Sequence, residues 1–145
     1  MKPESRIKLR NLLHSHEGYE QFPYMDTTNN LTIGIGRNLS FRGISLNEAD
    51  FLLDGDITYF NDRLNEYLPF FKNMSEERQI ALIDMCFNLG FNGFMKFKKM
   101  LLALERKDYE EAANEMIKSD WAEQVKKRAI DLSNIIRTGK LWNGF

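Results

Sequence analysis

The spacing of apolar residues changes from helical to strand-like near the N-terminus, and this change constrains the fold more than any other feature. Over residues 4–15 apolar side chains fall at helical spacing, among them Leu9, Leu12 and Leu13. Beyond Glu17 the segments 21–24 and 31–35 favour strands, and the intervening Asn29-Asn30 is typical of a hairpin turn. The chain is therefore predicted to begin with an amphipathic helix that leads directly into a β-hairpin.

This hairpin would fold two carboxyl groups and a hydroxyl toward the end of the first helix. Glu17 ends the helix, Asp26 precedes the polar turn, and Thr32 lies on the second strand. Cleavage of a glycosidic bond commonly uses one protonated carboxyl group and one ionised carboxylate, which need different environments. Glu17 follows an apolar helix and Asp26 borders a polar turn, so both requirements can be met. The alternative is that these are ordinary solvated side chains of a surface hairpin.

The remainder of the chain reads as helices. Ser45 and Glu48 form a capping box at the start of a helix over residues 45–67, which Pro69 ends. The next helix begins after Ser75 and stops at Gly90, and its nearly continuous apolar surface predicts a buried central position. Further helices are expected at residues 95–104, 108–117 and 126–136, with a short turn around Trp121.

Composition excludes several classes of site. The chain has 145 residues and a single cysteine, Cys86, so an internal disulfide is impossible. His14 and His16 are two residues apart and point to different sides of a helix, so no metal site is expected, and no organic cofactor is implied. The net charge is −1, and no basic stripe is interleaved with aromatic residues, so nucleic acid is not an expected partner.

The N-terminal segment is charged and lacks an apolar run, so neither a secretory signal nor a membrane anchor is predicted. No apolar run approaches the length needed to cross a bilayer, and membrane insertion is not expected. A protein of this kind would be made in the cytoplasm. It is expected to be a monomer, because the sequence reveals no large apolar surface.

Three short motifs near the N-terminus resemble those of the phage-type lysozymes, glycoside hydrolase family 24. They are Glu17-Gly18, then Tyr24-Met25-Asp26, then Thr32-Ile33-Gly34-Ile35-Gly36. Residues 81–90 are similar to the family's A-L-[IV]-[DS]-x-x-F-N-x-G helix. Trp121, Gln124 and Arg128 are similar to its W-x-x-Q-x-x-x-R segment, and Arg137-Thr138-Gly139 resembles its final motif, which we interpret as structural.

The resemblance covers nearly the whole chain and implies an α+β fold that is mostly α, with two lobes. Residues 1–145 would form a single lysozyme domain. A small sheet lobe would span residues 17–44, and the helix at 45–67 would link it to a helical lobe over 70–145, which would also include the N-terminal helix.

The resemblance implies a muramidase, which hydrolyses the β-1,4 bond between N-acetylmuramic acid and N-acetylglucosamine in bacterial peptidoglycan. Glu17 would be the general acid, while Asp26 and Thr32 would position the attacking water and so invert the sugar. Inversion requires carboxyl groups about 6.5–9.5 Å apart. The alternatives are a lytic transglycosylase, for which one glutamate suffices, and an inactive wall-binding or structural module.

The same resemblance implies a substrate-binding role for Phe87, Asn88 and Arg128. Arg128 would either pair with Glu17 across the cleft or remain a solvated helix charge. An amide such as that of Asn88 can both donate to and accept from a sugar N-acetyl group. The enzyme would reach the cell wall from the cytoplasm through a holin and act in the periplasm during host lysis.

Two departures from the family pattern lead to expectations of their own. The loop between Gly36 and Ser45 is short, so the small lobe would cover fewer sugars than in longer family members. Arg37 follows the T-I-G-I-G motif, where the family often has histidine. We expect Arg37 to pair with Asp56 on the linking helix.

Overall fold

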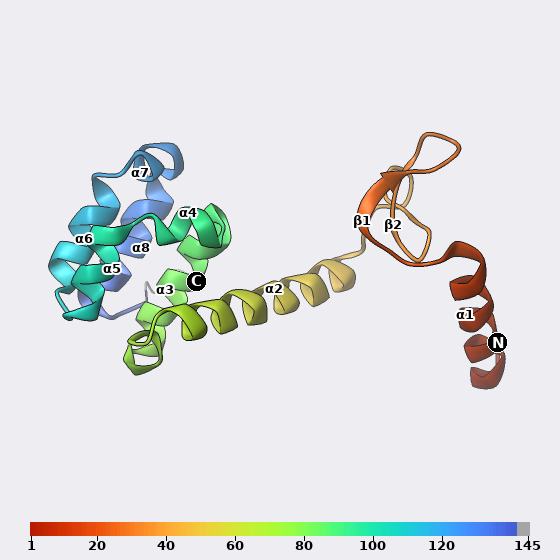
Figure 1. The fold of residues 1–145 in the computed structure, drawn as a ribbon, viewed down its shortest axis with the longest axis horizontal. Coiled ribbons are helices and arrows are strands. Elements are labelled where there is room, and N and C mark those ends of the chain that lie inside the picture. The colour runs from red at the N-terminus through yellow and green to blue at the C-terminus, as the bar shows by residue number, and fades with distance from the viewer. Residues whose placement is uncertain (142–145) are drawn as a thin grey trace. The chain divides into compact units, whose positions relative to one another are not determined.

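The structure is a computed structural model that describes residues 1–141 (Figure 1). The chain divides into two compact units, the first formed by Met1–Phe51 and the second beginning at Leu52. The long helix α2, Leu46–Tyr67, starts in the first unit and continues in the second. The assignment of the N-terminal helix to the helical lobe depends on how the two units are placed, and it stays a prediction.

The first unit contains helix α1 and a three-stranded antiparallel sheet. α1 spans Pro3–Glu17, and the strands are β1 (Glu20–Met25), β2 (Leu31–Gly34) and β3 (Arg37–Asn38), in the order β1-β2-β3. Tyr24 pairs with Thr32 across the hairpin, and Ile33 pairs with Arg37 across the second turn. The predicted helix and hairpin are confirmed. The short strand β3 was not expected, because two residues are too few to show a period.

Arg37 does not pair with Asp56, so that prediction is wrong. Its guanidinium forms a two-pronged ion pair with Glu48, in the first turn of α2, and also donates to the Gly43 carbonyl at 3.1 Å. Asp56 lies eight residues further along the helix, about 12 Å away at the usual rise per residue. Glu48 also completes the predicted capping box, because it accepts from the Ser45 N–H at 2.7 Å and its own N–H donates to the Ser45 hydroxyl at 3.2 Å.

This arrangement makes the stability of the protein depend on pH. The Arg37 hydrogen bonds are the largest cause that lowers the pKa of Glu48 from its ordinary 4.5 to about 2. A carboxyl group whose pKa is lower in the folded state than in the unfolded state stabilises the folded protein. This stabilisation is complete at pH values above the unfolded-state pKa, and it is lost as the pH falls toward the folded-state pKa. We therefore expect Glu48→Gln to lower the melting temperature at about pH 6 and to lower it much less near about pH 2.

Glu66→Gln is a suitable control, because it removes an acid from the other end of the same helix. Thermal unfolding of the parent and both variants across this pH range measures the effect. A Glu48→Gln deficit that stayed constant down to low pH would contradict this assignment.

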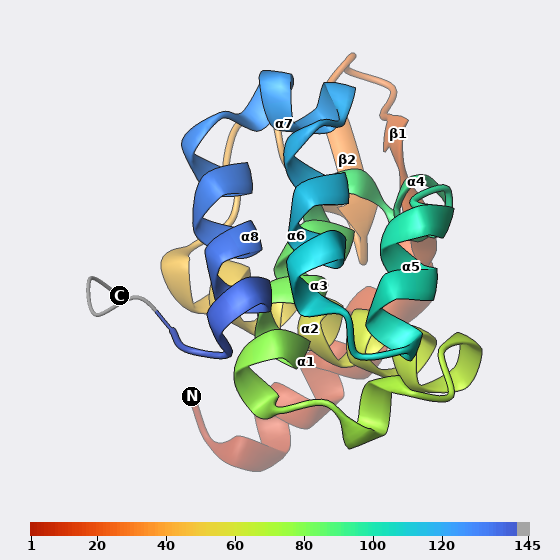
Figure 2. The same ribbon diagram turned by 90° about the vertical axis from the view of Figure 1, so that its left-hand side faces the viewer.

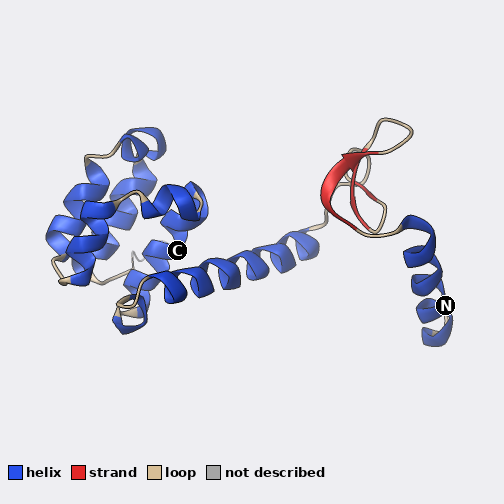
Figure 3. Cartoon of the chain, viewed as in Figure 1, coloured by secondary structure: helices blue, strands red, loops and turns tan. Residues whose placement is uncertain are grey.

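The second unit is entirely helical within the described residues. After α2 and a 3₁₀ turn at Phe71–Asn73, its helices are α3 (Glu76–Leu89), α4 (Phe91–Met95), α5 (Lys98–Glu105), α6 (Tyr109–Ile117), α7 (Asp120–Val125) and α8 (Lys127–Thr138). α8 packs against α3 on one side and α6 on another, and α6 packs against α5 (Figures 1 and 2). Every strand of the described chain lies in the first unit (Figure 3).

Helix α3 supplies the centre of this unit's core, as predicted. Its fully buried side chains are Ala81, Leu82, Met85 and Cys86. The predicted start of α3 after Ser75 is confirmed. Ser75 caps α3 and Asp108 caps α6, because each side chain accepts from the backbone N–H three residues later. Burial raises the pKa of the Cys86 thiol to about 11, so the thiol stays protonated and unreactive near neutral pH.

Two helix predictions in this unit need correction. The expected helix over 95–104 is interrupted, because the chain leaves helical geometry at Phe97 and forms the separate helices α4 and α5. The expected turn around Trp121 is a short helix, α7, which Ser119 caps by accepting from the Ala122 N–H at 3.2 Å. Among residues 1–141 no helix combines the length and apolar character needed to cross a bilayer.

Candidate active site

Asp26 is held by three hydrogen bonds that all fall on one carboxylate oxygen. Its Oδ1 accepts from the Thr28 N–H at 2.9 Å, the Thr28 hydroxyl at 2.9 Å and the Asn30 N–H at 2.8 Å. These donors favour the charged form, and the Asn30 N–H contributes most to lowering the pKa of Asp26 below its usual value. Within residues 1–141 no hydrogen bond reaches Oδ2. Asp26 is therefore an ionised carboxylate with one oxygen fixed and the other available to bind water or substrate.

Thr32 is linked to Asp26 through the backbone of Asn30. The Thr32 hydroxyl donates to the Asn30 carbonyl at 3.1 Å, and that carbonyl also accepts from the Asp26 N–H at 2.9 Å. Thr32 is 3% exposed, so its side chain has little freedom to reorient. Because the Thr32 hydroxyl proton is used in this hydrogen bond, the Thr32 oxygen can take part in further hydrogen bonds only as an acceptor.

The hairpin turn supplies the geometry for this cluster. Asn29 adopts a left-handed conformation with φ of 64°, which asparagine tolerates better than most residues. Its N–H donates to the Asp26 carbonyl at 3.0 Å and closes the turn. The Asn29-Asn30 pair therefore does more than reverse the chain, because Asn30 also provides the main donor to the Asp26 carboxylate.

Glu17 occupies the last position of α1 and lies directly against the turn between β2 and β3. Gly18 ends the helix with φ of 71°, and its N–H donates to the His14 carbonyl at 3.0 Å. On the other side is Gly36, where an added β-carbon would lie only 2.7 Å from Glu17 Oε2. The structure therefore brings the predicted acid into contact with the turn that follows Thr32, all within the first unit.

The three predicted substrate-binding residues lie in the second unit. Phe87 is 41% exposed and lines a pocket of about 370 Å³ with apolar side chains of α2 and α3. Asp84 and Arg128 also line this pocket and form an ion pair, with Arg128 Nε 2.8 Å from Asp84 Oδ1. Asn88 Oδ1 accepts a hydrogen bond from the Trp121 indole N–H at 2.8 Å. A substrate role for Phe87, Asn88 and Arg128 stays a prediction.

Arg128 has a partner that sequence reasoning did not identify. Within the second unit Arg128 donates to the Asp84 carboxylate and, at 3.3 Å, to the Asp84 carbonyl. Its predicted pairing with Glu17, which lies in the first unit, stays a prediction. Asp84 and Asn88 are four residues apart on α3, so the segment around α7 and the start of α8 meets this helix at two successive turns. The polar exceptions on an otherwise apolar helix were the available signal for these contacts. Trp121 is buried.

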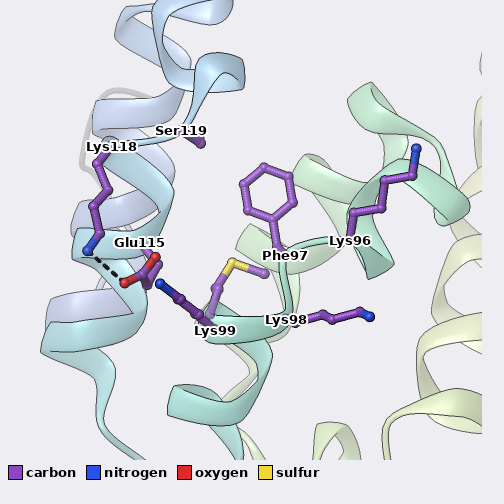
Figure 4. Close-up of a pocket in the computed structure, with 8 residues that line it drawn as sticks. Lys96, Phe97, Lys98, Lys99, Glu115, Lys118 and Ser119 are labelled. Carbon is purple, nitrogen blue, oxygen red and sulfur yellow. Dashed lines mark ion pairs between the residues drawn. The ribbon is translucent and has the colours of Figure 1, made fainter.

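A separate pocket of about 550 Å³ lies between the start of α5 and the end of α6 (Figure 4). Its charged lining consists of four lysines and Glu115: Lys96, Lys98, Lys99 and Lys118. Glu115 pairs with Lys118 at 2.7 Å, and this hydrogen bond is the main cause that lowers the pKa of Glu115. A carboxyl held ionised in this way is a poor proton donor, and none of the predicted site residues lines this pocket.

No group of three or more histidine, cysteine, aspartate or glutamate side chains within residues 1–141 is arranged to hold a metal ion. The first unit instead presents the exposed Glu17 carboxyl against the turn at Gly36 and the hydrogen-bonded Asp26 carboxylate in the hairpin, where the buried Thr32 hydroxyl donates to the Asn30 carbonyl. These are the functional groups of a glycoside hydrolase.

Comparisons with known proteins agree with this class. The phage lysozyme family model matches residues 14–134. The chain is 29% identical over 163 aligned positions to the probable T4-type lysozyme 2 of Dictyostelium discoideum, covering 92% of this chain and 95% of that protein. Identity to the probable T4-type lysozyme 1 of the same organism is 27%, with the same coverage. The chain is also 27% identical to the pre-baseplate central spike protein Gp5 of Enterobacteria phage T4, covering 93% of this chain and 28% of that protein.

The chain belongs to the phage lysozyme family. It is thus a glycoside hydrolase of the lysozyme type, and its substrate is peptidoglycan.

Proposed function

We propose that this lysozyme is a muramidase that hydrolyses the β-1,4 bond between N-acetylmuramic acid and N-acetylglucosamine with inversion. Glu17 is the general acid, and Asp26 together with Thr32 holds the attacking water. The observation that carries this proposal is the one-sided clamp on Asp26, in which three donors bind Oδ1 while Oδ2 accepts no hydrogen bond within residues 1–141.

The clamp suits a carboxylate that activates water. Its donors keep Asp26 ionised, and they fix the plane of the carboxylate. A water molecule that donates one hydrogen to Asp26 Oδ2 and the other to the Thr32 oxygen turns a lone pair toward the sugar. As this oxygen bonds to the anomeric carbon, Asp26 takes its proton, and Glu17 gives a proton to the leaving glycosidic oxygen.

The water-holding pair favours hydrolysis over the reaction of a lytic transglycosylase. That reaction uses an internal hydroxyl of the substrate in place of water, and a single acid is enough for it. The clamp on Asp26 and the buried hydroxyl of Thr32 would then have no function in the chemistry. The similarity to a phage spike protein raises a second candidate, an inactive wall-binding or structural module. The presence of Glu17, Asp26 and Thr32 together favours an active enzyme.

The proposal extends to the biological role. We also propose that Phe87, Asn88 and Arg128 contact the glycan, and that the protein acts as a monomer on the cell wall during host lysis. We propose that the protein is released from the cytoplasm to the periplasm through a holin.

The products of purified peptidoglycan distinguish the two reactions on this bond. We expect soluble fragments that end in a free reducing N-acetylmuramic acid, identified by mass spectrometry. Fragments lighter by one water, which carry a 1,6-anhydro end, would show that no water attacks and would overturn the roles of Asp26 and Thr32. Reducing ends on N-acetylglucosamine instead would show that the other glycosidic bond is cleaved.

A further inference from the structure

We propose that Gly36 is a positioning residue whose missing side chain provides the site in which the Glu17 carboxyl rests. This inference rests on the proposed role of Glu17 as general acid. A β-carbon built on Gly36 would lie 2.7 Å from Glu17 Oε2, 2.8 Å from Cδ and 3.1 Å from Cγ. The first two distances are shorter than real β-carbons tolerate, so any larger residue at this position must displace the Glu17 side chain or the turn.

The backbones on both sides of this contact are fixed, so the Glu17 side chain is the part most able to move. On one side, Glu17 is the final residue of α1, and the next residue is bonded back into the helix through the Gly18 N–H. On the other side, the turn is held by the pairing of Ile33 with Arg37. Arg37, directly after Gly36, is in turn anchored by its ion pair with Glu48. A methyl group at position 36 would therefore be expected to rotate the carboxyl away.

Gly34 provides an internal comparison in the same turn. Gly34 and Gly36 both have positive φ, 69° and 66°, a range in which L-amino acids are strained, so replacement by alanine carries a conformational cost at each. The surroundings of the two differ, because a β-carbon on Gly34 meets no atom within 4 Å. Backbone strain is thus common to both substitutions, and contact with the carboxyl is specific to Gly36.

Displacement of a catalytic group by about 1 Å can cost about 100-fold in rate. We therefore expect Gly36→Ala to lower kcat by about 100-fold with little change in KM, because the substrate still binds while the acid is misplaced. Gly34→Ala should lower kcat by less than about 3-fold. Its melting temperature should fall by about as much as that of Gly36→Ala, because both substitutions strain the backbone. The measurement is steady-state hydrolysis of soluble glycan strands from peptidoglycan, together with thermal unfolding of each variant.

Shortening the acid separates a positioning role from a general loss of structure. Aspartate at position 17 is one methylene shorter and withdraws its carboxyl from residue 36. Glu17→Asp lowers kcat by itself, but adding Gly36→Ala to it should then cost less than about 3-fold, so the two effects are strongly non-additive. Equal losses of activity in Gly34→Ala and Gly36→Ala, or full additivity with Glu17→Asp, would overturn the proposal.

The inference and the proposed function fail in different ways. If Glu17→Gln is inactive and Gly36→Ala is fully active, Glu17 is essential and Gly36 does not position it. If Glu17→Gln keeps full activity, the catalytic role of Glu17 is wrong, and the positioning role of Gly36 falls with it.

Discussion

Replacing Glu17 by glutamine should abolish peptidoglycan hydrolysis while leaving the protein folded. Glutamine keeps the shape of the side chain but has no proton to give to the leaving oxygen. General acid catalysis contributes about 100-fold to 10,000-fold in rate, so residual activity of about 1% or less is expected. The loss should appear in kcat, measured on purified peptidoglycan by the release of reducing ends.

Stability provides the control for this variant. Glu17 lies at the C-terminal end of α1, where a negative charge is unfavourable to the helix dipole. Removing that charge should leave the melting temperature equal to that of the parent or slightly above it. Lysis retained by a folded Glu17→Gln variant would show that another group donates the proton.

Replacing Asp26 by asparagine should cause the second large loss. An amide oxygen can still accept from the Thr28 and Asn30 backbone groups, so the hairpin should keep its structure. Asparagine cannot take a proton from water, and we expect a fall in kcat of about 100-fold or more. Steady-state rates of the variant measure the fall in kcat, and its circular dichroism spectrum shows whether the fold is kept.

Asp26→Glu is the matched variant, because it keeps the charge and moves the carboxylate by one methylene. It should retain more activity than Asp26→Asn if the carboxylate acts as a base on water. If asparagine is as active as the parent, Asp26 has no role in the chemistry, and the proposed water-holding role is wrong.

Local sequence patterns were sufficient to predict the helix and hairpin that carry the proposed catalytic residues, since the contacts that define these elements are local. The hairpin, the capping box at Ser45 and Glu48, the start of α3 after Ser75 and the end of α1 each depend on residues within a few positions of one another. The clamp on Asp26 lies within the five residues 26–30, yet it was not foreseen. Its donors are mainly backbone groups, and their direction depends on turn geometry that residue types alone do not fix.

The incorrect partner predicted for Arg37 and the contacts that were not predicted involve residues separated by longer stretches of chain. Several acidic residues of the α2 segment were possible partners for Arg37. The pairing with Glu48 follows from the point at which the connecting loop meets the helix. The Asp84–Arg128 pair joins residues 44 positions apart, and it requires the packing of α8 on α3. The helix break at Phe97 contains no proline or glycine, so the residue types did not predict it.

The clamp on Asp26 also bears on how lysozymes of this family can change in length. All of its hydrogen bonds close within residues 26–30, so no contact with the rest of the protein is needed to orient the carboxylate. Insertions and deletions elsewhere, including in the short stretch before α2, are therefore expected to leave these hydrogen bonds intact. Such a self-contained turn allows the remainder of the first unit to vary in length while the orientation of the Asp26 carboxylate is kept.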